Sequence, residues 1–543
     1  MMNLIHTPEG VRDIIPSELD KKIETAGKLI KTMKDCGFKL MQTPSFEYFD
    51  VFANNIGMTP SSQLYKFYDK EGNTLVLRPD FTPAMARAYS KLYYDNDGPV
   101  KLCYCGNTFV NASDLNGRLK ESTQIGAELY NDDSAEADAS MISLVISCMK
   151  CAGFDDFIVS VGNVNFFRGL CEEMGLTDAD ESTLRNLILS GNNYRVRELL
   201  DELKVDREYA DLFVHLSDSF STADSLNGLK KRIKSKRCKE ALERLAAITG
   251  ILEKEGNSSY ISIDLGLLNM YDYYTGVLFR AYTFGSGDAV MKGGRYDNLV
   301  KEFGNDTPAI GFGISLDELM FARSDQKNRS VAGNEYITFA LTKGRLADKT
   351  LEILEKAGYT CEEMKDKGTR KLIFVNEDLK LRFFLAKGPD VPTYVEHGVA
   401  DIGVVGYDTI VEEGRKILEV LDLGIGKCRM CVCGHESAKE LLRKKDMIKV
   451  ATKYPKTAKA YFNDKHQGVD IIKLNGSIEL APIVNLSDVI VDIVETGSTL
   501  KENGLAVLEE ICQLSARMVV NPVSMKLHYK RISEMTDRIR EVL

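Results

Sequence analysis

The sequence predicts an α+β unit followed by a two-lobed α/β unit, and three observations support this division. The chain has 543 residues and a mass of 60.6 kDa, which is too much for one compact core. Up to about residue 322, short apolar runs and polar turns surround one long helical stretch. From residue 335 onward, apolar runs are each followed by a tight loop and a helical pattern, which is typical of parallel α/β folds.

The first unit, residues 1–322, is expected to hold an antiparallel sheet with flanking helices. Apolar positions at helical spacing predict a helix over 17–36, shortly after the turn at 8–10. The stretch 163–256 is mostly helical, as in an insertion between strands. Strands are predicted from the runs LVLR (75–78), VKLCYCG (100–106), FIVSVG (157–162) and VLFRAY (277–282).

A polar stretch, residues 323–334, is expected to be a linker to a second unit over 335–543. Within the second unit, the runs at 337–341, 401–406 and 489–495 are predicted strands, each leading through a loop into a helix. Ligands in such folds gather at the carboxyl ends of the strands, so these loops are candidate binding sites.

Composition excludes several classes of protein. With 44% hydrophobic and 28% charged residues, the chain is neither disordered nor fibrous. No apolar run approaches the roughly 18 residues of a membrane helix, and the N-terminus lacks the order of a signal peptide. The twelve cysteines fit reduced thiols. We therefore expect a cytoplasmic protein without membrane contact.

The charge disfavours a nucleic-acid partner. The net charge of −10 lies entirely in residues 1–330, because residues 331–543 hold equal numbers of acidic and basic side chains. A phosphate backbone requires dense Lys and Arg instead. One basic run, 230–239 (KKRIKSKRCK), is interpreted as a solvated helix face.

The loop Thr496-Gly497-Ser498-Thr499 is the first candidate phosphate site. Between a buried strand and a helix, such a loop exposes backbone N–H groups and hydroxyl donors to an anion. Asp492 and Glu495 just upstream could hold sugar hydroxyls or a magnesium ion that bridges phosphates. A plain helix cap at Ser498 or Thr499 explains the loop equally well.

A second candidate is Lys343-Gly344-Arg345, where a glycine between two cations lets the backbone approach an anion. Arg370-Lys371 repeats the pairing of cations near a strand. No metal site is predicted from side chains: Cys428, Cys431 and Cys433 form only half of a zinc pattern and are interpreted, like Cys103 and Cys105, as strand residues. His397 is interpreted as a capping or packing residue.

The second unit resembles the short form of ATP phosphoribosyltransferase, the enzyme that begins histidine biosynthesis. The motifs that carry the resemblance are ALTKGRL, DVPTYVEHGVADIGVVGYD, VLDLGIGKCRM, VATKYPKTAKAYF, IIKLNGSIELAPIV and DIVETGSTLKENGL. The resemblance implies a two-lobed fold like that of periplasmic binding proteins. It also implies attack of adenine N1 of ATP on the anomeric carbon of phosphoribosyl pyrophosphate, with Mg²⁺ as cofactor.

The resemblance also implies roles for particular residues. Arg345 and Arg370 would hold the pyrophosphate, with Lys343 nearby as a third catalytic cation. Residues Glu495, Thr496, Gly497, Ser498 and Thr499 would hold the ribose 5-phosphate, and Asp492 would complete the phosphoribosyl pyrophosphate site. Cations aimed at the leaving group would stabilise the transition state more than the ground state.

The first unit resembles histidyl-tRNA synthetase, whose class II fold is mainly antiparallel. The motifs are TPEGVRDIIP, LRPDFTPAMARAY, ESTQIGAELY, YDYYTGVLF, GGRYDNLVKEFG and PAIGFGISLDEL. Three positions where that family has arginine hold Val110, Asn269 and Glu318. Because adenylate formation needs arginines on the ATP phosphates, we expect no activation of histidine and no charging of tRNA.

The amino-acid pocket of that family is expected to survive and to bind histidine as an inhibitor. The residues that the resemblance assigns to it are Asp80, Thr82, Gln124, Glu128, Tyr273 and Tyr274. The order of the two units resembles a fusion of the synthetase-like regulatory subunit with the catalytic subunit, and it implies a homo-oligomer. Two alternatives remain: an active synthetase fused to the transferase, or a solute-binding module in the second unit.

Overall fold

The computed structural model describes residues 5–53, 59–111, 119–190, 192–214, 216, 223–269, 274–329, 335–365, 371–444 and 447–543. Its contacts divide the chain into two compact units, Met1–Asn334 (unit 1) and Glu335–Leu543 (unit 2). No helix among the described residues is both long and apolar enough to cross a membrane. All twelve cysteines are free thiols.

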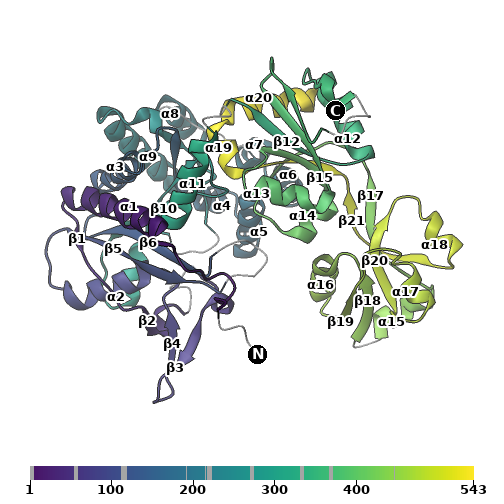
Figure 1. Ribbon diagram of the computed structural model, residues 1–543, viewed down its shortest axis with the longest axis horizontal. Coiled ribbons are helices and arrows are strands. Elements are labelled where there is room, and N and C mark those ends of the chain that lie inside the picture. The colour runs from purple at the N-terminus through teal and green to yellow at the C-terminus, as the bar shows by residue number, and fades with distance from the viewer. Residues whose placement is uncertain are drawn as a thin grey trace. The chain divides into compact units, whose positions relative to one another are not determined.

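Unit 1 is built on an eight-stranded sheet that is mostly antiparallel, as predicted (Figure 1). Only the edge pairs β1–β5 and β7–β8 of this sheet run parallel. The order across the sheet is β1 (Lys39–Leu40), β5 (Val100–Phe109), β6 (Glu121–Tyr130), β11 (Ala309–Ser315), β10 (Met291–Arg295), β9 (Val277–Thr283), β7 (Phe157–Asn163) and β8 (Ile261–Ile263).

The two faces of this sheet differ because side chains alternate along each strand. Along β6, Ile125, Ala127 and Leu129 join the main apolar core with α1 (Pro16–Asp35), α3 (Ala135–Cys151) and α11 (Leu316–Arg329). Their even-numbered neighbours on β6 point to the opposite face, where Tyr130 packs with α2 (Thr82–Leu92) and α10 (Asp297–Glu302). The polar residues of the predicted pocket therefore belong to the second face.

The remaining elements of unit 1 are a small sheet and the inserted helices. The small sheet has the order β2 (Phe46–Tyr48), β4 (Thr74–Leu77) and β3 (Lys66–Tyr68). The predicted insertion consists of α4 (Val164–Glu173), α5 (Asp178–Leu189), α6 (Asn193–Glu202), α7 (Arg207–Val214), α8 (Ala223–Arg232) and α9 (Lys236–Lys254). Residues of these helices extend the main apolar core.

The predicted linker 323–334 is wrong over its first part, because α11 continues to Arg329. The run RSDQKNR contains neither glycine nor proline, so it can continue a helix and is not an extended connection. Residues 330–334 lie outside the described residues.

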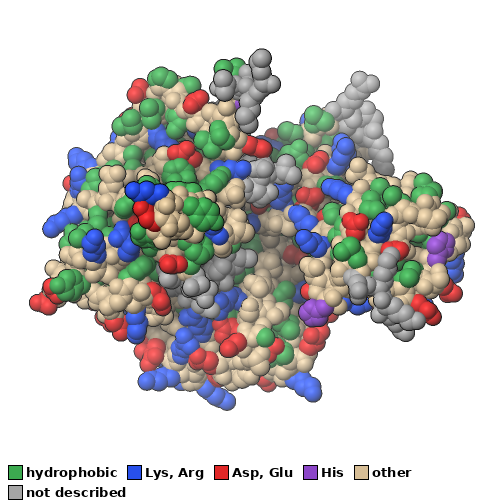
Figure 2. Space-filling model, turned by 90° about the horizontal axis from the view of Figure 1, so that it is seen from below, with side chains coloured by type: hydrophobic (Ala, Val, Ile, Leu, Met, Phe, Trp, Pro, Cys, Tyr) green, Lys and Arg blue, Asp and Glu red, His purple; other side chains and the backbone are tan. Residues whose placement is uncertain are grey.

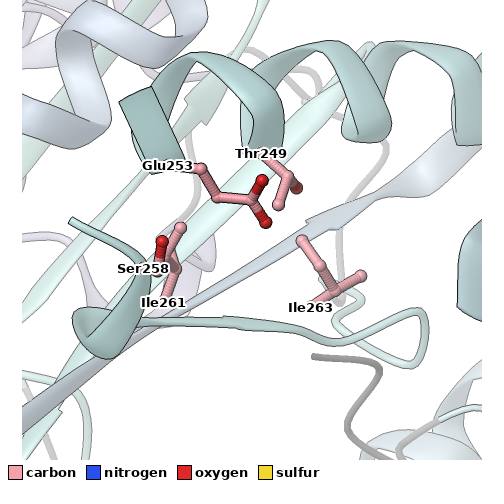
Figure 3. Close-up of a pocket in the computed structure, with 5 residues that line it drawn as sticks. All are labelled: Thr249, Glu253, Ser258, Ile261 and Ile263. Atoms are coloured by element: carbon pink, nitrogen blue, oxygen red, sulfur yellow. The ribbon is translucent and has the colours of Figure 1, made fainter. Parts of the chain in front are cut away.

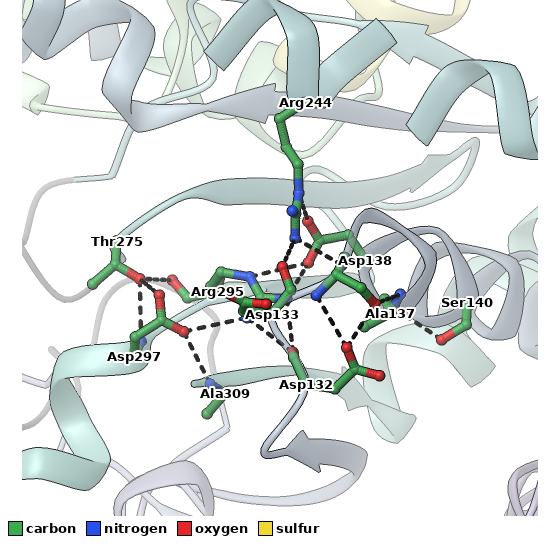
Figure 4. Close-up of polar contacts among 11 residues, drawn as sticks. Asp132, Asp133, Ala137, Asp138, Ser140, Arg244, Thr275, Arg295, Asp297 and Ala309 are labelled. Atoms are coloured by element: carbon green, nitrogen blue, oxygen red, sulfur yellow. Dashed lines mark hydrogen bonds and ion pairs between the residues drawn. The ribbon is translucent and has the colours of Figure 1, made fainter. Parts of the chain in front are cut away.

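A buried carboxylate ties α9 to the sheet (Figure 4). Asp138 is fully buried, and its two oxygens accept from Arg244 Nε at 2.6 Å and from Arg295 Nη2 at 2.5 Å. These residues line a cleft of about 390 Å³. Its arginines are already engaged by carboxylates and carbonyls, so we assign the network a structural role.

The hollow in Figure 3, beside Thr249 and Glu253, is about 10 Å³, which is room for little more than a water molecule.

The basic run 230–239 is not a single helix face, because it includes the end of α8 and the start of α9, but four of its cations pair with acids. Ion pairs join Lys230 to Glu243, Arg232 to Glu208, Lys236 to Glu240 and Arg237 to Glu172. On the face shown in Figure 2, acidic and basic side chains are interspersed.

Unit 2 consists of two lobes, each with its own sheet (Figure 1). The first lobe has the strand order β13 (Ile373–Asn376), β14 (Leu381–Ala386), β12 (Ile337–Thr342), β15 (Ile402–Gly406), β22 (Ala516–Val520) and β16 (Leu418–Asp422). Its helices are α12 (Arg345–Lys356), α13 (Val391–Glu396), α14 (Tyr407–Glu413), α19 (Pro522–Leu527) and α20 (Tyr529–Glu541).

The second lobe has the strand order β19 (Gly468–Lys473), β18 (Met447–Thr452), β20 (Val489–Val494), β17 (Cys428–Gly434) and β21 (Ala506–Leu514). Its helices are α15 (Ala438–Lys444), α16 (Pro455–Asp464), α17 (Leu480–Ile483) and α18 (Ser498–Glu502). In each lobe the three strands that precede candidate loops run parallel, namely β14–β12–β15 and β19–β18–β20. The loops of each lobe therefore gather at one sheet edge.

Candidate functional site

The loop after β12 holds two free cations at the edge of the first lobe. The backbone of Lys343 donates to the carbonyl of Ala386 at 2.9 Å, which fixes the loop against β14. Gly344 has φ 98° and ψ −154°, a conformation that only glycine adopts without strain. The Lys343 and Arg345 side chains are exposed and pair with none of the described residues. Lys387, after β14, is likewise exposed and unpaired.

In the loop 496–499 the N-cap residue of α18 provides no side-chain cap, although the Thr496 hydroxyl accepts from the backbone of Ser498 at 3.4 Å. Gly497 occupies the N-cap position with φ 76°, and Ser498 is already the first residue of the helix. The hydroxyls of Thr496 and Ser498 lie 3.0 Å apart and bond to each other, and both residues are exposed. The alternative of a cap at Ser498 or Thr499 is therefore wrong, and the loop retains free donors.

A carboxylate and a cation that the sequence analysis did not pair lie at the edge of the second lobe. β18 and β20 are parallel neighbours, so Lys453, after β18, comes beside Asp492, near the end of β20. Burial raises the pKa of Asp492, Glu479 adds to the rise, and the Lys453 ammonium opposes it. Lys453 was missed because its place beside Asp492 depends on strand order.

The loops of the two lobes meet at Asp408 and Tyr454. The Tyr454 hydroxyl donates to Asp408 Oδ2 at 3.3 Å, although Asp408 belongs to the first lobe and Tyr454 to the second. Burial raises the pKa of Cys428 to about 11, and both Asp408 and Glu495 add to the rise. Cys428 thus lies near acids of both lobes.

The remaining transferase predictions have separate outcomes. Arg370 lies outside the described residues. Cys428, Cys431 and Cys433 belong to strand β17, as interpreted, and the described residues contain no group of three or more His, Cys, Asp and Glu side chains that could hold a metal. His397 Nδ1 lies 2.9 Å from the carbonyl of Thr393 at the end of α13, as a capping residue would.

In unit 1, the structure brings together five of the six predicted pocket residues. Glu128 is fully buried; Oε1 accepts from Thr82 Oγ1 at 3.0 Å, and Oε2 accepts from the Tyr296 hydroxyl. Gln124 Nε2 donates to Asp80 Oδ1 at 3.0 Å. Tyr274 is 7% exposed in the same cluster. Tyr273, the sixth, lies outside the described residues.

Glycines of β11 make room for the pocket's polar side chains. Register places Gly311 opposite Glu128. A Cβ at Gly311 would lie 1.5 Å from Glu128 Oε2, and one at Gly313 would lie 2.3 Å from Gln124 Nε2. A larger residue at either position would displace the Glu128 or Gln124 side chain from its place in the pocket. The spacing of the two glycines in AIGFGIS therefore has a steric cause that the sequence analysis did not identify.

The pocket holds two carboxyl groups, Glu128 and Asp80, for which the described residues provide no ion pair. Burial raises the pKa of Glu128 to about 8, against the opposing effect of the Tyr296 and Thr82 donors. Burial likewise raises the pKa of Asp80, and Asp80 Oδ2 has no hydrogen-bond partner among the described residues. A cationic group entering the pocket would stabilise both carboxylates.

Arg280 of β9 is a pocket residue that sequence reasoning missed. Burial raises the pKa of Tyr274, and the charge of Arg280 opposes the rise, so the two lie close together. Arg280 Nη2 donates to the carbonyl of Leu268 at 2.7 Å. The only signal in the sequence was the position of Arg280 in the strand VLFRAY, where side chains alternate between the two faces of the sheet. A second arginine of unit 1, Arg78 at the end of the LVLR run, donates to the carbonyls of Thr43 and Asn107 and is therefore already hydrogen-bonded.

The positions of the three replaced arginines carry no cation. The backbone of Val110, just after β5, donates to the carbonyl of Lys120 at 2.9 Å. Asn269 ends the described stretch before residue 270, and Glu318 lies in the first turn of α11. Beside Glu318, Asp317 accepts from Lys22 Nζ at 2.6 Å and from the backbone of Thr123 at 2.7 Å.

Comparisons with known proteins match the two units to two different families. The histidyl-tRNA synthetase family model matches residues 10–319, and the ATP phosphoribosyltransferase family model matches residues 387–541. An ATP phosphoribosyltransferase of Lachnoclostridium phytofermentans is 73% identical over 210 residues, which are 38% of this chain and 98% of that protein.

For unit 1, an ATP phosphoribosyltransferase regulatory subunit of Acetivibrio thermocellus is 35% identical over 323 residues, 60% of this chain and 77% of that protein. The crystal structure of an ATP phosphoribosyltransferase regulatory subunit/histidyl-tRNA synthetase from Bacillus halodurans aligns with a TM-score of 0.55 at 26% identity. That alignment covers 71% of this chain and 99% of the other. The chain therefore belongs to the ATP phosphoribosyltransferase family, with a histidyl-tRNA synthetase-like first unit related to the regulatory subunits of that enzyme.

Proposed function

We propose that this chain transfers the phosphoribosyl group of phosphoribosyl pyrophosphate to N1 of the adenine of ATP and releases pyrophosphate. The observation that carries the proposal is the set of exposed cations at the carboxyl ends of the parallel strands of unit 2. Lys343, Arg345 and Lys387 have no partner among the described residues, whereas the basic run of unit 1 is paired with acids. Unpaired cations at a ligand-binding edge suit a polyanionic substrate.

In this proposal, each loop holds a part of the substrate. Lys343 and Arg345 flank a glycine on the first lobe and would hold the pyrophosphate, together with Arg370. The loop 496–499 on the second lobe would hold the 5-phosphate through its hydroxyl and amide donors. As the bond to pyrophosphate breaks, negative charge grows on the leaving group, and the fixed cations stabilise that charge.

The residues present fit a magnesium ion carried by the substrate. Mg²⁺ is usually held by one or two carboxylates together with phosphate oxygens and water. Asp492 and the exposed Glu495 provide such carboxylates beside the phosphate loop. Magnesium would supply charge neutralisation on the pyrophosphate, and Asp492 and Glu495 would orient the ribose.

One assay separates this activity from its alternatives. Consumption of ATP together with phosphoribosyl pyrophosphate, with release of pyrophosphate, is expected only of the transferase. A solute-binding module would bind without turnover. An active synthetase fused to the transferase would, in addition, consume ATP with histidine when phosphoribosyl pyrophosphate is absent.

We also propose that unit 1 senses free histidine and inhibits the transferase. The buried carboxyl of Glu128 and the half-buried Asp80, whose Oδ2 is enclosed, suit the cationic amino group and imidazole of histidine, and Arg280 suits its carboxylate. Binding at one unit would inhibit the other by favouring one quaternary arrangement, with a coupling typically of about 1–3 kcal/mol. We also propose that the protein forms a homo-oligomer in the cytoplasm. Its molecular mass in solution, measured with and without histidine, tests whether it is an oligomer and whether histidine changes the assembly.

No histidyl-adenylate is expected to form. Val110, Asn269 and Glu318 cannot neutralise the phosphates of ATP, and Glu318 would repel them. The measurement is histidine-dependent exchange of labelled pyrophosphate into ATP, with protein free of host synthetase. Exchange clearly above background would show that unit 1 retains activation chemistry.

Histidine binding is expected to release a proton near neutral pH. With a pKa of about 8, Glu128 is mostly protonated in the free pocket at pH 7, and it must ionise to accept from the ligand's ammonium group. Through this group, affinity should therefore rise about fivefold as pH increases from 7 to 8, approach a tenfold rise near pH 9, and level off above. Calorimetry in two buffers of different ionisation enthalpy measures the released proton. Binding without proton release would contradict this linkage.

A further inference from the structure

The two lobes of unit 2 are joined along one side by short chain crossings. The segment 423–427 connects β16 to β17, and Ser515 connects β21 to β22. Asp422 Oδ1 accepts from Ser515 Oγ at 2.7 Å and from the backbone of Gly424 at 2.9 Å. Gly424 and Gly426 both have positive φ angles, 64° and 65°. Few residues, two of them glycines in a left-handed conformation, carry the whole connection, as in a hinge.

A second contact between the lobes joins α14 to α16. Glu412 of the first lobe accepts from the backbone of Lys456 at 3.1 Å through Oε1. Its other oxygen accepts from the backbone of Thr457 at 3.1 Å and from the Thr457 hydroxyl at 3.0 Å. Lys456 Nζ also donates to the carbonyl of Glu413 at 3.0 Å. Four hydrogen bonds therefore cross between the lobes at this point.

These bonds replace a cap that the second lobe does not provide for itself. Tyr454, the N-cap residue of α16, makes no side-chain cap hydrogen bond. The first amides of a helix need acceptors, and a carboxylate there also meets the positive end of the helix dipole. Glu412 fulfils both requirements from the opposite lobe. Glu412 thus provides side-chain acceptors for the start of α16 only while the two lobes are together, and water would have to replace them when the lobes separate.

The contact lies beside the candidate substrate loops. Tyr454, which donates to Asp408 across the lobes, directly follows Lys453 at the end of β18. The cations at 343 and 345 belong to the first lobe, and the phosphate loop 496–499 belongs to the second. One substrate can engage both sets only when the lobes stand at a fixed separation.

We propose that Glu412 is a positioning residue that holds the two lobes of the transferase closed, so that the loops of both lobes meet one phosphoribosyl pyrophosphate. The proposal rests on the transferase activity proposed above. Without Glu412 the free enzyme would open about the segment 423–427, and substrate binding would have to close it again. A binding-competent state that is populated only in part raises the apparent dissociation constant in proportion.

The test is steady-state kinetics of the full chain with Mg²⁺ and saturating ATP. For Glu412→Gln, which keeps the volume of the side chain, and for Glu412→Ala, we expect the KM for phosphoribosyl pyrophosphate to rise about 5- to 20-fold. We expect kcat to stay within about twofold, because the bound substrate restores closure. Glu413→Gln is the matched control: it removes a neighbouring charge on α14 but no side-chain bond to α16 among the described residues, and it should behave as wild type.

Hydrogen exchange supplies the readout that a simple helix cap would not change. In Glu412→Gln without substrate, amides of 423–427 should exchange faster than in wild type, and saturating phosphoribosyl pyrophosphate should restore their protection. An unchanged KM, or faster exchange confined to the first turn of α16, would overturn the proposal. Should wild type show no transferase turnover, the proposed function fails, while exchange of 423–427 without substrate still decides whether Glu412 holds the lobes.

Discussion

Replacing Arg345 by alanine is expected to lower kcat/KM for phosphoribosyl-ATP formation by about 10²- to 10³-fold, or ~2.7–4 kcal/mol of transition-state stabilisation. The guanidinium is exposed, unpaired among the described residues and follows Gly344 at the carboxyl end of β12. It can form two parallel hydrogen bonds to a pyrophosphate that gains charge as the bond breaks. Arg345→Lys should recover only part of the rate, because an ammonium lacks the bidentate geometry.

The position of Arg345 in its helix argues for a ligand. It is the first residue of α12, where the helix dipole disfavours a cation by roughly 0.3–1 kcal/mol. Arg345→Ala should therefore fold as stably as wild type or slightly more so, which separates lost chemistry from lost structure. Thermal unfolding measured beside the kinetics checks this separation.

The matched control for Arg345→Ala is Lys349→Ala. Lys349 is an exposed cation one turn further along α12, away from the loop. It should turn over as wild type does. Arg370→Ala is expected to lose activity as Arg345→Ala does. Wild-type turnover in both arginine variants would remove the pyrophosphate assignment.

The second large effect is expected for histidine inhibition. Glu128→Gln should weaken inhibition by on the order of 10- to 100-fold, if the lost charged contact contributes about 1.5–3 kcal/mol. Turnover without histidine should change little, because Glu128 belongs to unit 1 and the transferase loops belong to unit 2. Glutamine keeps an acceptor for Thr82 or Tyr296, so fewer buried donors are left unpaired than with alanine.

Inhibition curves for two further variants complete the test. Glu121→Gln removes an acid from the same strand, but one that contacts Asn107 at an exposed site, and it should be inhibited as wild type is. Tyr274→Ala should weaken inhibition together with Glu128→Gln. If both pocket variants respond to histidine as wild type does, histidine acts elsewhere and the pocket of unit 1 has no regulatory role.

Much of the fold could be predicted from local patterns. The helix expected at 17–36 is α1, and the runs at 157–162 and 277–282 lie within β7 and β9. Both depend on hydrophobic periodicity over short windows, which reflects burial directly. The linker from residue 323 was wrong because an exposed helix end and a polar linker have the same composition, and only the hydrogen bonding of the backbone distinguishes them.

Candidate site residues next to recognisable loops could also be named in advance. Lys343, Arg345 and the loop 496–499 follow strands whose ends are visible in the sequence. Lys453 and Arg280 could not be named in advance, because the residues that they lie close to, Asp492 and Tyr274, are distant in the chain. They come together only through strand order and register.

The sequence by itself determined the two units, the family of each and the loss of three arginines, because all of these are carried by contiguous motifs. Tertiary structure alone decided how charges pair. It alone shows that Glu128 is buried beneath Gly311, that Asp80 keeps an unpartnered oxygen, and that Glu412 caps a helix of the opposite lobe. Burial and the pairing of residues distant in the chain determine the pKa of a carboxyl group and whether a cation is paired. Neither the burial nor the pairing follows from a residue's neighbours in the chain.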